Sequence, residues 1–189
     1  MSKIFIIKAG LTDYIEGNLN FITQGVRMFD HCTNLTSFNY DLSSLTGGNY
    51  MFSNCSNLTS FNGDLSSLTS GYYMFEYCRS LTSFNNDMSS VTDCGNMFYY
   101  CSNLTSFNGD LRSLTSGSKM FGSSTSTCTK LDLASVQNIA ETINDLAAKG
   151  TTGSISIGIS KTIQGNTELE AALATIRSKG WTVSEIYKS

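Results

Sequence analysis

A segment of 23 residues occurs four times in this chain with little change. The copies begin at Met28, Met51, Met74 and Met97, and eleven of their positions are identical in all four. A fixed period of this length predicts a solenoid, in which one short unit stacks on the next and neighbouring units share a core. The repeat holds no set of catalytic side chains, so we expect a non-enzymatic protein whose function lies in the positions that differ between copies.

The composition argues against several classes of protein. Charged residues make up 14% of the chain, against about 25% in typical soluble proteins, and no basic stripe predicts a nucleic-acid partner. The apolar run between Lys3 and Lys8 is too short for a secretory signal, and no stretch is long and apolar enough to predict a membrane-spanning helix. We therefore leave localisation open between the cytoplasm and a cell surface or virion reached by a non-classical route.

The six cysteines fall into two groups. Equivalent residues on neighbouring coils should lie about 4.8 Å apart, so the cysteines at the repeat period should form a ladder inside the stack. We expect the ladder cysteines to pack as reduced thiols, in the manner of small hydrophobic residues, rather than as disulfides. They are Cys32, Cys55, Cys78 and Cys101. Cys94 and Cys128 fall outside the ladder, and we expect them to be more exposed.

The pattern divides the chain into three parts, 1–27, 28–119 and 120–189. Residues 3–8 predict a short first strand, and residues 5–27 match the repeat frame weakly and predict a degenerate N-terminal coil. Within each full copy, Leu-Thr-Ser-Phe-Asn predicts a short strand. The stretch Asn49–Cys55 predicts a turn of helix, because its apolar side chains fall on one side of such a turn.

After residue 120 the pattern changes to longer elements. We predict a strand over 131–133, a helix capped by Ser135 with inward residues up to Ala147, and a strand over 154–160. A capping box at Thr167 and Glu170 predicts a second helix, and residues 181–187 predict a last strand. This order predicts parallel pairing, and the simplest arrangement adds these strands to the sheet of the repeats as a C-terminal cap.

The motif Met-Phe-x-x-Cys-x-x-Leu-Thr-Ser-Phe-Asn-x-Asp-Leu-Ser-Ser-Leu-Thr resembles the BspA-like short leucine-rich repeats of bacterial surface proteins. The resemblance is close over residues 28–119 and looser over 15–136. It implies an α/β leucine-rich-repeat solenoid with a parallel β-sheet. It also implies a function in adhesion or in binding to host proteins.

Few residues suggest chemistry. His31 is the only histidine, and without a fixed acid or nucleophile beside it we expect it to lie on the surface. An aspartate ladder could hold calcium between coils, but we favour a role in which each carboxylate accepts a backbone N–H in a turn. The ladder consists of Asp41, Asp64, Asp87 and Asp110. We predict no metal site, no cofactor and no catalytic residue.

The positions that vary between copies are rich in Tyr, Asn, Ser and Gly, and we expect them to face solvent. This composition is typical of antibody paratopes, in which Tyr gives rigid contact area and the small residues adapt. Undirected drift of surface residues is the alternative, but it should supply more Lys, Glu, Gln and Ala. We therefore predict a face that binds a protein or a glycan, made of Tyr50, Tyr72, Tyr73, Tyr77, Tyr99 and Tyr100. The alternative function is that of a structural repeat subunit in a surface or phage virion assembly.

Overall fold

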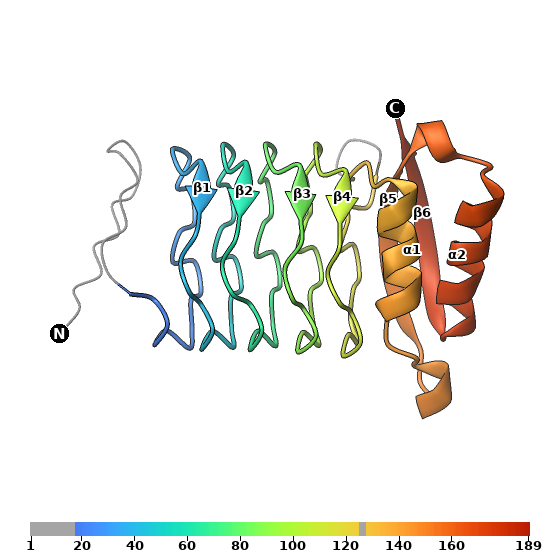
Figure 1. Cartoon of the computed structure of the whole chain (residues 1–189), viewed down its shortest axis with the longest axis horizontal. Coiled ribbons are helices and arrows are strands. Elements are labelled where there is room, and N and C mark those ends of the chain that lie inside the picture. Colours follow the sequence, from blue (N-terminus) through green and yellow to red (C-terminus); the bar gives the residue numbers. More distant parts are fainter. Residues whose placement is uncertain (1–17, 125–127) are drawn as a thin grey trace.

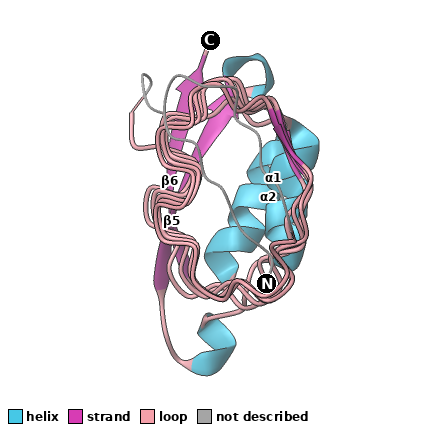
Figure 2. Cartoon of the chain, turned by 90° about the vertical axis from the view of Figure 1, so that its left-hand side faces the viewer, coloured by secondary structure: helices cyan, strands magenta, loops and turns pink. Residues whose placement is uncertain are grey.

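The repeats form a row of similar coils, and the chain ends in two helices and two long strands (Figure 1). The structure is a computed structural model that describes residues 18–124 and 128–189. Seen along the row, successive coils superimpose as a flattened ring (Figure 2). The predicted strand over 3–8 lies outside the described residues. The described end of the degenerate coil does stack as predicted, since Gln24 bridges Gly47 and Arg27 donates its N–H to the carbonyl of Asn49.

Two hydrogen-bonded ladders on different parts of the ring join the coils. The first contains the predicted strands, each reduced to a Ser-Phe pair: β1 (Ser37–Phe38), β2 (Ser60–Phe61), β3 (Ser83–Phe84) and β4 (Ser106–Phe107). Within it β1 pairs with β2 and β3 with β4, both in parallel. The second ladder is a series of single parallel bridges that runs through Gln24, Gly47, Ser70, Asp93 and Ser116.

The core between the ladders is built on two columns of phenylalanine. The strand column has nearly parallel rings, as in Phe38–Phe61 at 5.4 Å between centroids. The second column stacks in the same way, as in Phe52–Phe75 at 5.5 Å. Rings of the two columns meet edge to face, which is a favoured geometry for aromatic pairs. The invariant Phe residues therefore hold each coil both to its neighbour and across its own interior.

All six cysteines are buried and none forms a disulfide. The ladder cysteines are reduced thiols inside the stack, as expected. The expectation for Cys94 and Cys128 was wrong. Cys94 occupies the position of Gly48 and Gly71, where an added Cβ would lie about 3 Å from a Met side chain of the next coil. Its sulfur accordingly lies 3.3 Å from Sδ of Met120, in the core.

The predicted turn of helix over Asn49–Cys55 is not formed. Alternate N–H groups, including those of Tyr50 and Phe52, donate to carbonyls of the next coil, and the intervening groups bond within the turn. This alternation requires left-handed backbone at Tyr50 (φ 58°) and Asn54 (φ 62°). A continuous helix would satisfy its own N–H groups and leave none to join the coils.

The C-terminal strands join a different ladder from the one predicted. β5 (Gly153–Ser160) bridges Gly117 and Leu131 and pairs along its length with β6 (Trp181–Lys188) in parallel. These strands lie across the ring from the helices α1 (Leu133–Thr142) and α2 (Thr167–Ser178) (Figure 2). Next to β4, the last strand of the first ladder, lies α1 instead of a strand. The Ser135 hydroxyl of α1 accepts the N–H of Phe107 at 2.9 Å.

Both helix starts differ from the predictions by one to three residues. Asp132, not Ser135, caps α1 and accepts the N–H of Ser135, so the predicted strand over 131–133 is shortened to a single bridge at Leu131. Asn166, not Thr167, caps α2. α1 ends at Thr142, and a short 3-10 helix (Ala147–Lys149) leaves Ala147 exposed instead of inward. A second 3-10 helix (Lys161–Ile163) follows β5.

Within the two described ranges, the helices are too short and too polar to cross a membrane.

Candidate binding surface

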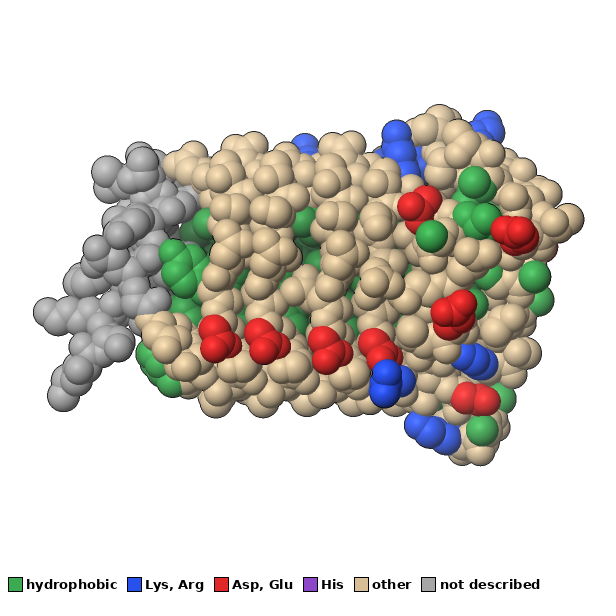
Figure 3. Space-filling view, viewed as in Figure 1, with side chains coloured by type: hydrophobic (Ala, Val, Ile, Leu, Met, Phe, Trp, Pro, Cys, Tyr) green, Lys and Arg blue, Asp and Glu red, His purple; other side chains and the backbone are tan. Residues whose placement is uncertain are grey.

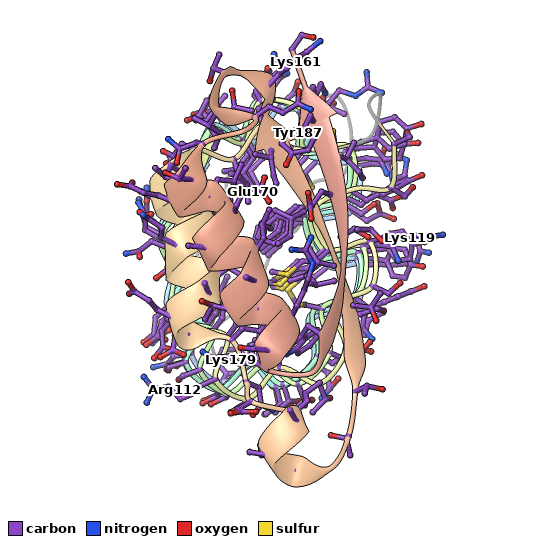
Figure 4. The ribbon with its side chains drawn as sticks, turned by 90° about the vertical axis from the view of Figure 1, so that its right-hand side faces the viewer. Arg112, Lys119, Lys161, Glu170, Lys179 and Tyr187 are labelled. Atoms are coloured by element: carbon purple, nitrogen blue, oxygen red, sulfur yellow. The ribbon has the colours of Figure 1, made fainter. Side chains whose placement is uncertain are left out.

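The structure brings the six predicted tyrosines together on one side of the stack. Tyr50 and Tyr73 each precede a repeat Met, and Tyr77 and Tyr100 each precede a ladder Cys. Tyr72 and Tyr99 stand one residue before Tyr73 and Tyr100. We call these six residues the Tyr face. Their positions belong to the segment of the coil that follows the second ladder. Lys119, at the position equivalent to Tyr50, points outward on the side of the stack away from α1 and α2 (Figure 4).

Ring contacts connect all six members into one cluster. Tyr50 stacks on Tyr73 with centroids 4.9 Å apart, and Tyr72 meets both rings edge to face. A further edge contact of 6.5 Å leads from Tyr73 to Tyr99, and Tyr99 meets Tyr100 at 4.9 Å. Tyr77 completes the cluster by stacking on Tyr100 at 4.3 Å. Residues that are spread over 51 positions of sequence therefore present one continuous aromatic surface.

Four of these tyrosines occupy strained backbone positions. Left-handed φ recurs at the residue before each repeat Met and at the residue before each ladder Cys, and none of these nine residues is glycine. Their φ values lie between 55° and 64°, a region that costs a non-glycine residue about 1–2 kcal/mol. Tyr50, Tyr73, Tyr77 and Tyr100 are among them. A turn with only a structural role would favour Gly at these positions, so the four tyrosines found there point to a role of their side chains at the surface.

Two arginines extend the aromatic cluster. The guanidinium of Arg27 lies 4.3 Å from the centre of the Tyr50 ring, and that of Arg79 lies 5.3 Å from the Tyr77 ring. Arg27 also forms an ion pair with Asp30 at 2.8 Å. The sequence prediction missed both arginines. The repeat alignment held the signal for Arg27, because it occupies the same position as Tyr50 and Tyr73.

Burial changes the acidity of groups on this surface. It raises the pKa of the Tyr73 phenol to about 12, with a further contribution from Tyr72, and it also raises the pKa values of Tyr50 and Tyr77. These phenols stay protonated at neutral pH and can donate hydrogen bonds. Burial likewise raises the pKa of the Glu76 carboxyl, which accepts the hydroxyl of Ser53 at 3.3 Å.

The expectation that all variable positions face solvent was wrong for several of them. Ser53 and Asn96 are buried, with 2% and 7% of their surface exposed. Asp30 is also buried, and its Oδ1 lies 2.8 Å from Nδ1 of His31. His31 itself is exposed, as predicted. The variable positions thus include core-facing sites, and the six tyrosines are half-buried or exposed.

The aspartate ladder forms turns, as favoured from the sequence. Asp41, Asp64 and Asp87 each accept the backbone N–H of the residue two positions later at 2.8–2.9 Å. Asp110 does the same with Arg112 and pairs with its guanidinium, which holds the pKa of that carboxyl below its usual value. A straight row of acidic side chains runs along the stack in Figure 3. Across the described ranges, no three His, Cys, Asp or Glu side chains gather closely enough to hold a metal ion.

Comparison with known proteins identifies the repeat. The sequence model described as "BspA type Leucine rich repeat region (6 copies)" matches residues 22–150. Neither the curated proteins nor the solved structures contain a significant match to this chain.

Proposed function

The chain belongs to the BspA-type leucine-rich repeat family, and from this starting point we propose that it is a non-catalytic recognition module that binds a protein or a glycan through the Tyr face. The stack of coils is then a solenoid scaffold that holds the binding residues in register. The family is consistent with binding or adhesion, and the Tyr face supplies a surface on which binding can occur.

The observation that carries this proposal is the ring network on strained backbone. Six tyrosines from four successive copies of the repeat touch one another, although four of them occupy positions where Gly would cost less free energy. Tyrosine and arginine are enriched at the energetic centres of protein interfaces. Rings that are already packed lose little conformational entropy when a partner docks.

A binding assay with two substitutions tests the proposal. Tyr72 and Tyr99 have ordinary backbone geometry, so Tyr72→Ala and Tyr99→Ala remove rings without altering strain. We expect each to weaken retention of a bound protein or glycan by about tenfold or more. Tyr40→Ala is the matched control, because Tyr40 follows β1 and packs on Phe38. Unaltered retention by both Tyr-face variants, with thermal unfolding unchanged, would contradict the proposal.

The second candidate is a structural subunit of a surface or virion assembly. The repetition itself favours it, because side-chain ladders such as Thr69 to Thr46 and Thr92 to Thr69 give a regular rod. Sizing of the purified chain separates the two functions. A lattice subunit should assemble with rising concentration, whereas a recognition module should remain a single discrete species.

A further inference from the structure

We propose, building on the binding function of the Tyr face, that the partner is a protein that presents acidic side chains, with Arg79 as the principal contact for a carboxylate. Three features of the molecule support this partner: the ring faces that are already in contact, the exposed cations without an ion pair in the described ranges, and the position of Arg79 in the repeat.

The ring faces of Tyr50 and Tyr77 are already in contact with other side chains. Tyr50 lies between Arg27 of the preceding coil, at 4.3 Å, and Tyr73 of the following coil, at 4.9 Å. Tyr77 contacts the Arg79 guanidinium as well as the stacked ring of Tyr100. A sugar would need an open aromatic face on which to stack. Ring edges and phenol hydroxyls remain for a partner, and these suit the mixed apolar and polar contacts of a protein epitope.

The exposed charged side chains on this surface are cations, namely Arg27, Arg79 and Lys119. Arg27 is neutralised by Asp30, and Glu76 is half-buried with its carboxylate bonded to Ser53. Arg79 and Lys119 are exposed, and neither forms an ion pair within the described part of the chain. Although the whole chain carries a net charge of −3, Arg79 is thus an exposed cation beside the Tyr face that an acidic partner can approach.

Arg79 is specific to one coil. The equivalent residues in the other copies are Thr33, Ser56 and Ser102, so the stack does not require a cation at this position. The ring of Tyr77 orients the guanidinium, and a guanidinium held in this way can bind a carboxylate through two parallel hydrogen bonds. Arg79 thus adds directional charge recognition to the aromatic surface.

The two C-terminal helices lie on another side of the stack from the Tyr face (Figure 4). Lys119 points away from α1 and α2, on the other side of the last coils (Figure 4). The helices therefore leave the Tyr face open along the coils that carry it.

An array of short random-sequence peptides tests the inference with the full chain. Each peptide is printed in two versions that differ only by Asp or Glu against Asn or Gln, beside neutral and acidic oligosaccharides. We expect preferential retention on acidic peptides, lost progressively as salt is raised. Arg79→Gln should lower that retention about tenfold, since it removes one charge-assisted contact. Lys161→Gln, which removes an exposed cation near the end of β5, should not.

The outcomes separate this inference from the function on which it rests. Equal retention of acidic and amide peptides, or an Arg79→Gln variant that binds normally, overturns the acidic-partner inference while a Tyr72→Ala defect still supports the Tyr face. Retention on oligosaccharides alone also overturns the acidic-partner inference, and it supports the Tyr face if Tyr72→Ala weakens that retention. No retention on either class overturns both.

Discussion

The thiol of Cys78 donates to the backbone carbonyl of Phe52 in the preceding coil, with Sγ and O 3.2 Å apart. The same contact joins Cys55 to Phe29 at 3.1 Å and Cys101 to Phe75 at 3.0 Å. These three ladder cysteines therefore fill core volume and also donate a hydrogen bond to a carbonyl on the neighbouring coil. This double role explains why the repeat keeps Cys where another small apolar residue would fit.

The first prediction concerns this bond. Cys78→Ala should lower the free energy of unfolding by about 1–2 kcal/mol, because it leaves a small cavity and removes the donor from the Phe52 carbonyl. Cys94→Ala is the matched control, since it removes an equally buried thiol whose shortest hydrogen-bonding contact is the Met120 sulfur. Chemical denaturation measures both losses. Equal losses would show that the thiol–carbonyl bond adds nothing.

The repeat period predicts the stack because each coil must bury the same side chains against the next. The ladder thiols, the short strands and the aspartate turns all follow from that requirement. The location of the Tyr face on one side also follows, since equivalent positions align along the stack. The division of the chain at residues 27 and 119 stays a prediction.

Other features depend on interactions that the period does not encode. Each repeat contributes to both ladders, so the sequence does not say which ladder β5 extends. Packing decides this, since Gly158 of β5 lies so close to the backbone of Thr129 that no Cβ would fit. Cys94 replaces a glycine and so resembles a variable surface position, although it points at Met120. Arg79 contacts Tyr77 through space from two residues along the chain, which no repeat alignment reveals.

The second prediction distinguishes turn formation from calcium binding in the aspartate ladder. Oδ1 of Asp64 accepts the N–H of Ser66 at 2.9 Å. Asp64→Asn keeps an acceptor at that place, so it should leave stability nearly unchanged, whereas Asp64→Ala should cost about 0.5–1.5 kcal/mol. Thermal unfolding with and without calcium should give the same midpoint. A calcium-dependent rise that is lost in Asp64→Asn would instead identify the ladder as a metal site.

The third prediction concerns pH. Burial raises the pKa of Glu76 above its ordinary value of 4.5, so the folded chain holds this proton more tightly than the unfolded chain. The resulting stabilisation is fully present below pH 4.5 and is lost as the pH rises through the folded pKa. Glu76→Gln should therefore raise the thermal midpoint at neutral pH and leave it unchanged in acid.

Glu141→Gln provides the control for this titration, because Glu141 is exposed on α1. It should show no such pH-dependent difference from the native chain. A Glu76→Gln variant that loses stability at neutral pH would mean that the ionised carboxylate, through Ser53 or Arg27, stabilises the fold.

The last prediction tests whether strained positions are kept for their side chains. Lys119 has φ 55°, is exposed, and bonds locally through its carbonyl to the N–H of Gly122. Lys119→Gly removes the left-handed strain, which stabilises the fold, but Gly also gives the unfolded chain more conformational entropy. The net effect should be a rise in the free energy of unfolding of up to about 1 kcal/mol. Lys119→Ala removes the same charge but keeps the strain, so it should not stabilise. If Gly stabilises the fold while weakening retention on acidic peptides, the chain gives up stability at this position for recognition. If the Gly and Ala variants have the same free energy of unfolding, the left-handed backbone costs little free energy, and backbone strain then does not support a binding role for the Tyr face.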